Sequence, residues 1–304
     1  MLQKTREHPR LPGVILPEEL AVTGQLQEAC AQQELVVFAV PSVFIRATAR
    51  QARAWLGTEP LLVSVAKGIE AGSFLTMTEI IAEELGADPR RLTALSGPTH
   101  AEEVSRDLPS AIVCAGQDMA TAMQVQAVFS NAVLRAYTNP DVRGVELCGA
   151  LKNIIALAAG ISDGIGFGDN AKAAIITRGM AEIARLGRAM GCEEHTFYGL
   201  AGIGDLIVTA TSRHSRNNRA GYLIGCGKSA EDAVREVGMV VEGLNALPAA
   251  MGLSARYGIE LPIIFAVNEI VQHDGDRREL VHRLMTRQYK RETPVEPLGI
   301  EVKL

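Results

Sequence analysis

The stretch VELCGALKNIIALAAG, residues 145–160, predicts a central helix. With about 3.6 residues per turn, Lys152 shares one face of that helix with Cys148, Ile155 and Ala159. Because burial disfavours the charged form of an ammonium group, the pKa of a lysine on such a face falls toward neutrality, where a general acid or base works best. The helix alone leaves a second interpretation equally open, a lysine that extends to water or pairs with a carboxylate in an interface.

Helical periodicity continues from this stretch to the end of the chain. Glycine-containing loops interrupt it at residues 160–168, 199–204 and 225–227, and Ser229–Asp232 resembles a capping box that opens another helix. The pattern predicts no further strand in this half. We therefore expect an all-α domain over residues 144–304.

The first half of the chain alternates short β-rich runs with helical segments, as parallel βαβ units do. These runs are apolar throughout, which indicates strands that are covered on both faces. They are Leu35–Val40, Leu61–Ala66, Leu92–Leu95, Ala111–Ala115 and Val133–Tyr137. Residues 1–143 are therefore expected to form an α/β domain with a parallel sheet, and the boundary is expected near Asn139–Gly144.

Composition points to an ordinary globular protein of two domains. The 304 residues are 47% apolar and 21% charged, which is enough chain and enough apolar surface for a substantial core. The formal net charge of −5 argues against a general nucleic-acid binder, so we expect small-molecule ligands. No uninterrupted apolar run reaches the length of about 20 residues that a membrane span needs.

The cysteines are scattered singly through apolar surroundings, without C-x-x-C pairs or the spacing of metal ligands. They are Cys30, Cys114, Cys148, Cys192 and Cys226. This pattern indicates reduced thiols and predicts neither a disulfide framework nor a metal site. The start of the chain has no apolar core that could serve as a signal peptide, so the cytoplasm is the expected location.

Glycine-rich phosphate-binding motifs are absent from the places where they would function. A dinucleotide-binding domain usually carries G-x-G-x-x-G between its first strand and first helix, and the first half of this chain has none. Residues 225–230, GCGKSA, imitate that fingerprint, but no predicted strand precedes them and Tyr222 stands where a P-loop needs its first glycine. Residues 202–205, GIGD, also lack a preceding strand.

Polar or glycine residues follow three of the predicted strands, at Val40–Ser42, Ala66–Gly68 and Ser96–His100. Since open α/β sheets bind ligands at the carboxyl ends of their strands, the three segments together favour a site at that edge. In the last segment, the Thr99 hydroxyl is suited to bond a substrate oxygen. That segment alone is equally compatible with a plain turn in which Thr99 is the N-cap of a helix.

The loop TSRHSRNNR, residues 211–219, concentrates cations and amides before a helical segment. Guanidinium groups and helix N-terminal N–H groups suit a phosphate, whereas most such charged runs are simply solvated. Asp205 lies in a glycine-flanked turn within an otherwise apolar stretch. It is therefore a candidate partner for Lys152.

Seven motifs occur in order along the chain. They are AKGIE (66–70), LSGPT (95–99), GVEL through LKN (144–153), DGIGFGDN (163–170), GIGDL (202–206), SRN (215–217) and VVEG (240–243). Together they resemble bacterial NAD(P)-dependent glycerol-3-phosphate dehydrogenase, from about Arg6 to Leu284 at the family's spacing. Seven motifs in register are highly specific, where any one would be weak. The resemblance implies an α/β domain with a Rossmann-type doubly wound sheet, followed by an all-α C-terminal domain.

By this resemblance the chain reduces dihydroxyacetone phosphate to sn-glycerol 3-phosphate, for phospholipid synthesis, with NADPH or NADH as cofactor. Lys152 resembles the catalytic proton donor to the carbonyl oxygen. The positions that resemble substrate contacts are Lys67, Gly97, Thr99, Asp205, Ser215, Arg216 and Asn217, the last three at the phosphate end. Those that resemble cofactor contacts are Lys67, Ala101, Arg216, Val240 and Glu242. We also expect a homodimer.

The resemblance begins part-way through the family's first domain. Family members start with a strand, the glycine-rich turn, its helix and a second strand, so about 40 residues of a Rossmann-type unit would be absent here. In the usual strand order, the absent strands would lie between a short strand at Leu20–Thr23 and the strand at Val36–Val40. Their absence would leave an open sheet edge and would remove the site that binds the pyrophosphate of the cofactor. We therefore expect either that the natural product begins upstream of Met1 or that this chain is a shortened form.

Two other functions are compatible with the sequence. One is an enzyme with the same two domain types that acts on a different hydroxy acid, although the segment Ser215–Asn217 favours a phosphorylated substrate. The other is a remnant, deficient in cofactor binding, that binds a sugar phosphate or a partner without catalysis. The presence of Lys67, Lys152, Asp205 and Arg216 argues against a remnant, and only the absent glycine turn argues for one. The choice between NAD and NADP stays open.

Overall fold

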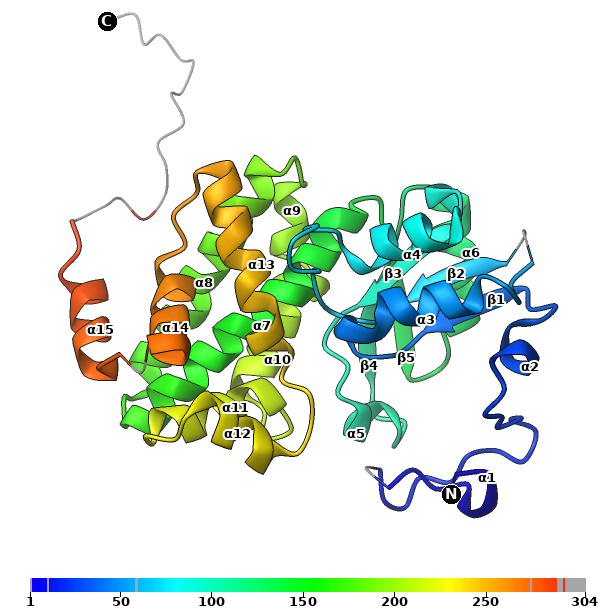
Figure 1. The fold of residues 1–304 in the computed structure, drawn as a ribbon, viewed down its shortest axis with the longest axis horizontal. Helices are drawn as coiled ribbons and strands as arrows, with labels where there is room; N and C mark the ends of the chain where they lie inside the picture. Colours follow the sequence, from blue (N-terminus) through cyan, green and yellow to red (C-terminus); the bar gives the residue numbers. More distant parts are fainter. Residues whose placement is uncertain (1, 10, 58–59, 274, 289–291, 293–304) are drawn as a thin grey trace, which may run out of the picture.

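The computed structural model describes residues 2–9, 11–57, 60–273, 275–288 and 292. A five-stranded sheet flanked by helices forms one part of the molecule, and the second part consists, over its described residues, of helices alone (Figure 1). The expected fold class, a Rossmann-type α/β region followed by an all-α region, is confirmed.

The strands follow one another across the sheet in the order of the chain. They are β1 (Leu35–Phe38), β2 (Leu61–Ser64), β3 (Leu92–Ser96), β4 (Ser110–Gly116) and β5 (Leu134–Asn139). β1, β2 and β3 are parallel, as are β4 and β5, but β3 and β4 are antiparallel. The expectation of a wholly parallel sheet is wrong at this pair. Between them lies only the four-residue helix α5 (Ala101–Val104), which is too short to cross a face of the sheet and return in parallel.

The expected strand at Leu20–Thr23 is also wrong. These residues form no strand, and the side chain of Leu20 is exposed. A segment becomes a strand only where a neighbour satisfies its backbone N–H and C=O groups, and among the described residues none pairs with this one. β1 is one edge of the described sheet.

Helices cover both faces of the sheet, as the continuous apolar runs predict (Figure 1). α3 (Ile45–Ala52) and α4 (Met77–Leu85) pack on one face around Leu62 of β2. α6 (Met119–Phe129) packs on the opposite face around Cys114 of β4. The loops that follow β1 and β2 contact the helical region through Ser42 and Lys67.

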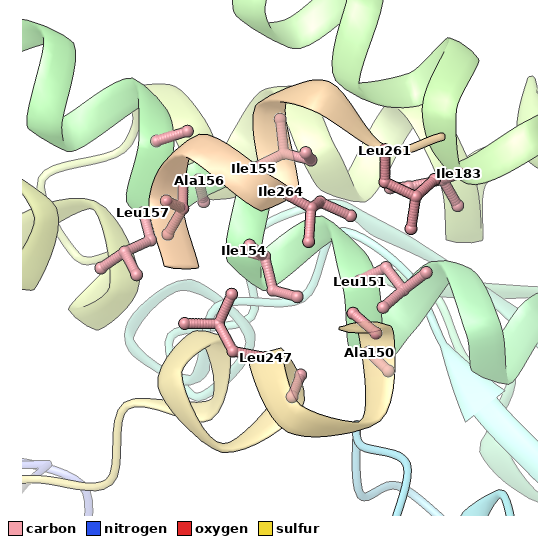
Figure 2. Close-up of a cluster of buried hydrophobic side chains, with 14 of the residues drawn as sticks. Ala150, Leu151, Ile154, Ile155, Ala156, Leu157, Ile183, Leu247, Leu261 and Ile264 are labelled. Atoms are coloured by element: carbon pink, nitrogen blue, oxygen red, sulfur yellow. The ribbon is translucent and has the colours of Figure 1, made fainter. Parts of the chain in front are cut away.

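The predicted central helix is α7 (Val142–Ile165), and its side chains are buried along almost its whole length. Other helices pack around it, as Figure 2 shows for the isoleucines and leucines at its core. The main ones are α8 (Asp169–Ala189), α10 (Asp205–Thr211), α11 (Arg216–Gly225), α13 (Glu242–Tyr257) and α14 (Pro262–His273). Among the described helices, α7 alone is long and apolar enough to cross a membrane, but its apolar stretch lies wholly inside the protein.

Glycines allow α11 to approach α7 more closely than larger residues would. A Cβ atom at Gly160 would lie 2.0 Å from the carbonyl oxygen of Asn218, and one at Gly221 would lie 2.1 Å from that of Leu157. Both contacts are with backbone, which cannot swing away as a side chain can. The two helices therefore fix the position of the loop before α11, which carries the basic segment.

The remaining elements are short or peripheral. They are α1 (Leu2–Thr5), α2 (Leu26–Cys30), η1 (Ser42–Phe44), η2 (Pro89–Arg91), α9 (Glu194–Phe197), η3 (Leu200–Gly204), α12 (Ala230–Val237) and α15 (Arg277–Met285). Residues 225–230 join α11 to α12, where the Ser229 hydroxyl accepts a hydrogen bond from the Asp232 N–H at 3.1 Å. The predicted helix start at Ser229 is confirmed, and the glycine-rich segment is a helix-to-helix turn.

Candidate active site

Lys152 lies in the middle of α7 with its side chain almost fully buried, 4% exposed. Its Nζ is 3.0 Å from Oδ1 of Asp205 and donates a hydrogen bond to the Thr209 hydroxyl at 2.5 Å. Burial lowers the pKa of Lys152 to about 8; the Asp205 charge opposes this shift, while the charges of Lys67 and Arg216 add to it. The expected pairing with Asp205 is therefore present, and this lysine does not extend to water.

Asp205 joins the two regions of the molecule. Its other oxygen, Oδ2, is 2.6 Å from Nζ of Lys67, which also donates to the carbonyl oxygen of Gly97 at 3.0 Å. Burial alone would raise the pKa of Asp205, but the neighbouring charges of Lys152 and Lys67 outweigh it and the pKa is lowered. One ionised carboxylate thus holds one lysine from α7 and another from the loop after β2.

The turn before α10 aims Asp205 at the two lysines. Gly202 in η3 has a non-helical backbone, with φ −93° and ψ −105°, and breaks the chain between η3 and α10. A Cβ atom here would lie 2.1 Å from the carbonyl oxygen of Phe197, so only glycine fits. α10 then starts at Asp205, where a carboxylate is favoured by the N-terminal helix dipole.

The loops after β1, β2 and β3 meet at one edge, as expected from the strand-end rule. A Cβ atom on Gly68 would lie 2.3 Å from Cβ of Ser42, and the Lys67 ammonium reaches the carbonyl of Gly97. Thr99 Oγ1 donates to that same carbonyl at 3.2 Å. The N-cap position of α5 is occupied by His100, so Thr99 is not a helix cap and its hydroxyl stays beside the lysine loop.

The basic loop leads into α11, whose N-cap is Ser215. The Ser215 hydroxyl accepts a hydrogen bond from the Asn218 N–H at 3.2 Å and is buried. The Asn217 side chain donates to Asn153 Oδ1 at 3.0 Å and accepts from the Gly243 N–H at 2.8 Å. Asn217 therefore ties α11 to α7 and α13, while Arg216 is close enough for its charge to lower the Lys152 pKa.

Family models cover most of the chain and both of its regions. Residues 1–122 match the model described as NAD-dependent glycerol-3-phosphate dehydrogenase N-terminus, and residues 141–282 match the model of its C-terminus. The chain belongs to this dehydrogenase family. The resemblance drawn from the seven motifs is confirmed.

Curated relatives and a solved structure agree with this assignment. Glycerol-3-phosphate dehydrogenase (NAD(P)+) 2 of Lactobacillus delbrueckii subsp. bulgaricus is 56% identical over 295 residues, 96% of this chain and 88% of that protein. A Fusobacterium nucleatum glycerol-3-phosphate dehydrogenase (NAD(P)+) is 47% identical over 283 residues, 93% and 84% of the two chains. The crystal structure of glycerol-3-phosphate dehydrogenase from Coxiella burnetii superposes with a TM-score of 0.90 at 34% identity, over 94% and 87% of the chains.

Among the positions expected to contact the cofactor, Glu242 lies at the junction of the two regions. Glu242, the first residue of α13, accepts hydrogen bonds from the Ser42 N–H at 3.0 Å and from the Ser42 hydroxyl at 2.5 Å. Ala101 is the first residue of α5, and Val240 lies in the segment before α13. Glu242 therefore links the helical region to the loop after β1.

The sequence analysis did not single out Thr209, and it named Ser42 and His100 only as parts of the strand-end segments. Thr209 accepts from Lys152 and donates to the carbonyl of Asp205 at 2.6 Å, and its place one turn after Asp205 was the available signal. Ser42 donates a hydrogen bond to Glu242, although the two residues are 200 positions apart in the sequence. No local sequence pattern predicts such a contact. His100 belongs to the loop after β3, but only the fold reveals what surrounds its ring.

Proposed function

We propose that the chain reduces dihydroxyacetone phosphate to sn-glycerol 3-phosphate with Lys152 as the proton donor. The observation that carries the proposal is the buried lysine with a pKa of about 8, held by Asp205 at the edge where three strand ends meet. Such a lysine is largely protonated at neutral pH, yet releases its proton more readily than an ordinary lysine.

Each charged group then has a defined task. When hydride reaches the carbonyl carbon, negative charge develops on the carbonyl oxygen, and the Lys152 ammonium neutralises it by giving up a proton. Asp205 stays ionised between the two lysines and keeps Nζ of Lys152 oriented. Solvent returns the proton after the product leaves.

The substrate is held by groups from both regions. Lys67, Gly97 and Thr99 supply an ammonium, a small residue and a hydroxyl at the strand ends. The phosphate binds at the start of the ten-residue helix α11, where Arg216 and the free N–H groups of the first turn attract an anion. Ser215 and Asn217 shape that helix start through their own hydrogen bonds.

The residues at the strand-end edge fit a dinucleotide. Val43 and Phe44 in η1 are 57% and 53% exposed, an unusual state for apolar side chains that suits contact with a flat ring. These residues, together with Lys67, Ala101, Arg216, Val240 and Glu242, would hold NADH or NADPH, which supplies the hydride when bound. The division into domains at residues 143 and 144, a homodimer and a cytoplasmic location are further parts of this proposal.

The decisive experiment follows oxidation of NADPH, and separately of NADH, when dihydroxyacetone phosphate is added. We expect turnover by the chain and a loss of about 10²- to 10⁴-fold in kcat for Lys152→Ala, the usual size of a general-acid contribution. Lys172→Ala is the matched control, because Lys172 pairs with Asp163 at 2.9 Å outside the site. A folded chain that binds sn-glycerol 3-phosphate without turnover would instead support the binding-only alternative.

A further inference from the structure

His100 is a polar group at the site that takes no part in the proposed proton transfer. It follows Thr99 in the loop after β3 and immediately precedes α5. The centroid of its ring lies 6.1 Å from that of His214, which belongs to the basic loop before α11. The imidazole therefore lies between the strand-end loop of the α/β region and the phosphate-binding segment of the helical region.

The Nε2 atom of His100 is buried and has no hydrogen-bond partner in the part of the chain that the structure describes. A buried nitrogen left unpaired destabilises the folded state, so native proteins rarely keep one without a ligand or an ordered water. The nitrogen adjoins the proposed substrate loop, so the substrate is the natural partner.

Groups on α5, α7 and α10 act on the His100 ring. Burial lowers the pKa of His100, the Lys152 charge lowers it further, and the Val208 backbone, Glu102 and Asp205 oppose the shift without reversing it. The lowered pKa favours the neutral ring in the absence of a ligand. The Val208 backbone accepts the single N–H of that ring, so the unpartnered Nε2 carries no hydrogen in this state. A phosphate dianion bound beside the ring favours its protonated form, in which both nitrogens carry N–H and Nε2 becomes a donor.

The same site has an excess of positive charge. Lys67 and Arg216 both act on Lys152, and within this group Asp205 is the carboxylate that balances one of the three cations. Two positive charges thus remain, which matches the charge of a phosphate monoester near neutral pH. His214 immediately precedes Ser215, the N-cap of α11. The His100 ring therefore lies near the helix start that is proposed to bind the phosphate.

We propose that His100 is a further substrate-binding residue, whose Nε2–H donates a hydrogen bond to the phosphate group of the substrate. The identity of the phosphate ester rests on the proposed function, whereas the capture of a phosphate anion does not. The contact connects the α/β region to an anion held by the helical region, and it orients the carbonyl relative to Lys152.

The test compares His100→Met, which keeps side-chain bulk without a donor, with His100→Gln, which retains an N–H. Loss of the His100 hydrogen bond to the charged phosphate should raise KM for dihydroxyacetone phosphate about tenfold or more in H100M. In H100Q, which keeps a donor, KM should stay within about threefold of its value in the unsubstituted chain. KM for NADPH should be unchanged in both. His195→Met, an exposed histidine on α9, is the control for loss of an imidazole.

A folded H100M protein with an unchanged KM overturns the proposal, and so does an H100Q protein as impaired as H100M, since the ring would then matter only for packing. A second measurement is made on the original chain and does not depend on the stability of a variant. Inorganic phosphate should shift the NMR resonances of the His100 ring in a saturable way, with H100Q providing their assignment. The absence of a shift overturns the proposal. A shift without any reduction of dihydroxyacetone phosphate would reject the proposed function and leave the anion contact standing.

Discussion

The helical region and the α/β region form their halves of the site by opposite means. In the helical region, Lys152 and Asp205 lie within helices, each side chain 4% exposed, and they hold each other. In the α/β region, Lys67 lies in a loop after a strand and is 22% exposed. The difference matches the proposed division between a desolvated proton donor, Lys152, and accessible ligand-binding loops.

Asp205→Asn should have the largest effect, because it removes the charge that connects the two halves. Both lysines would lose their counter-ion, and breaking a buried ion pair costs about 3–5 kcal/mol. We expect kcat/KM to fall by about 10³-fold or more, and denaturant unfolding to show a clear loss of stability. Asp163→Asn is the control, since its pair with Lys172 is more exposed. If D205N has near-normal kcat/KM, the two halves are independent.

Lys67→Met should separate the two halves by their kinetic signatures. If this accessible lysine binds substrate as proposed, its loss should raise KM for dihydroxyacetone phosphate by about tenfold to a hundredfold, the size of a lost hydrogen bond to a charged group. The effect on kcat should be much smaller than that of Lys152→Met. Steady-state kinetics of the two variants provide the comparison. A kcat loss in K67M equal to that in K152M would contradict the division of labour.

Thr209→Val should produce the smallest effect, a change in pH dependence. A proton donor works only while it is protonated, so kcat for reduction should fall as pH rises through about 8, the pKa of Lys152. Thr209 accepts a hydrogen bond from the ammonium form, and its loss therefore lowers the Lys152 pKa further. The alkaline limb of the kcat profile should move to lower pH by about 0.5–1 unit. A limb that stays in place would assign the titration to another group.

Local pattern was sufficient for the features that depend on neighbours along the chain. The apolar face around Lys152, the strand runs and the Ser229 helix start follow from periodicity and capping, and the structure confirms all three. The antiparallel pairing of β3 with β4 was not predicted, because each strand looks the same in either direction. Only the shortness of α5 hinted at the reversal.

The sequence by itself determined a lysine on an apolar helix face, a set of strand ends with polar tips and a basic loop before a helix. Each of these depends on residue type and on spacing within one or two turns of chain. The tertiary structure alone decided that one carboxylate, Asp205, serves both Lys152 and Lys67, the second of which is 138 residues away from it. It also decided that the rings of His100 and His214 lie near each other. Such contacts arise when packed helices and strands close in three dimensions, because side chains that are distant in sequence then share one low-dielectric space.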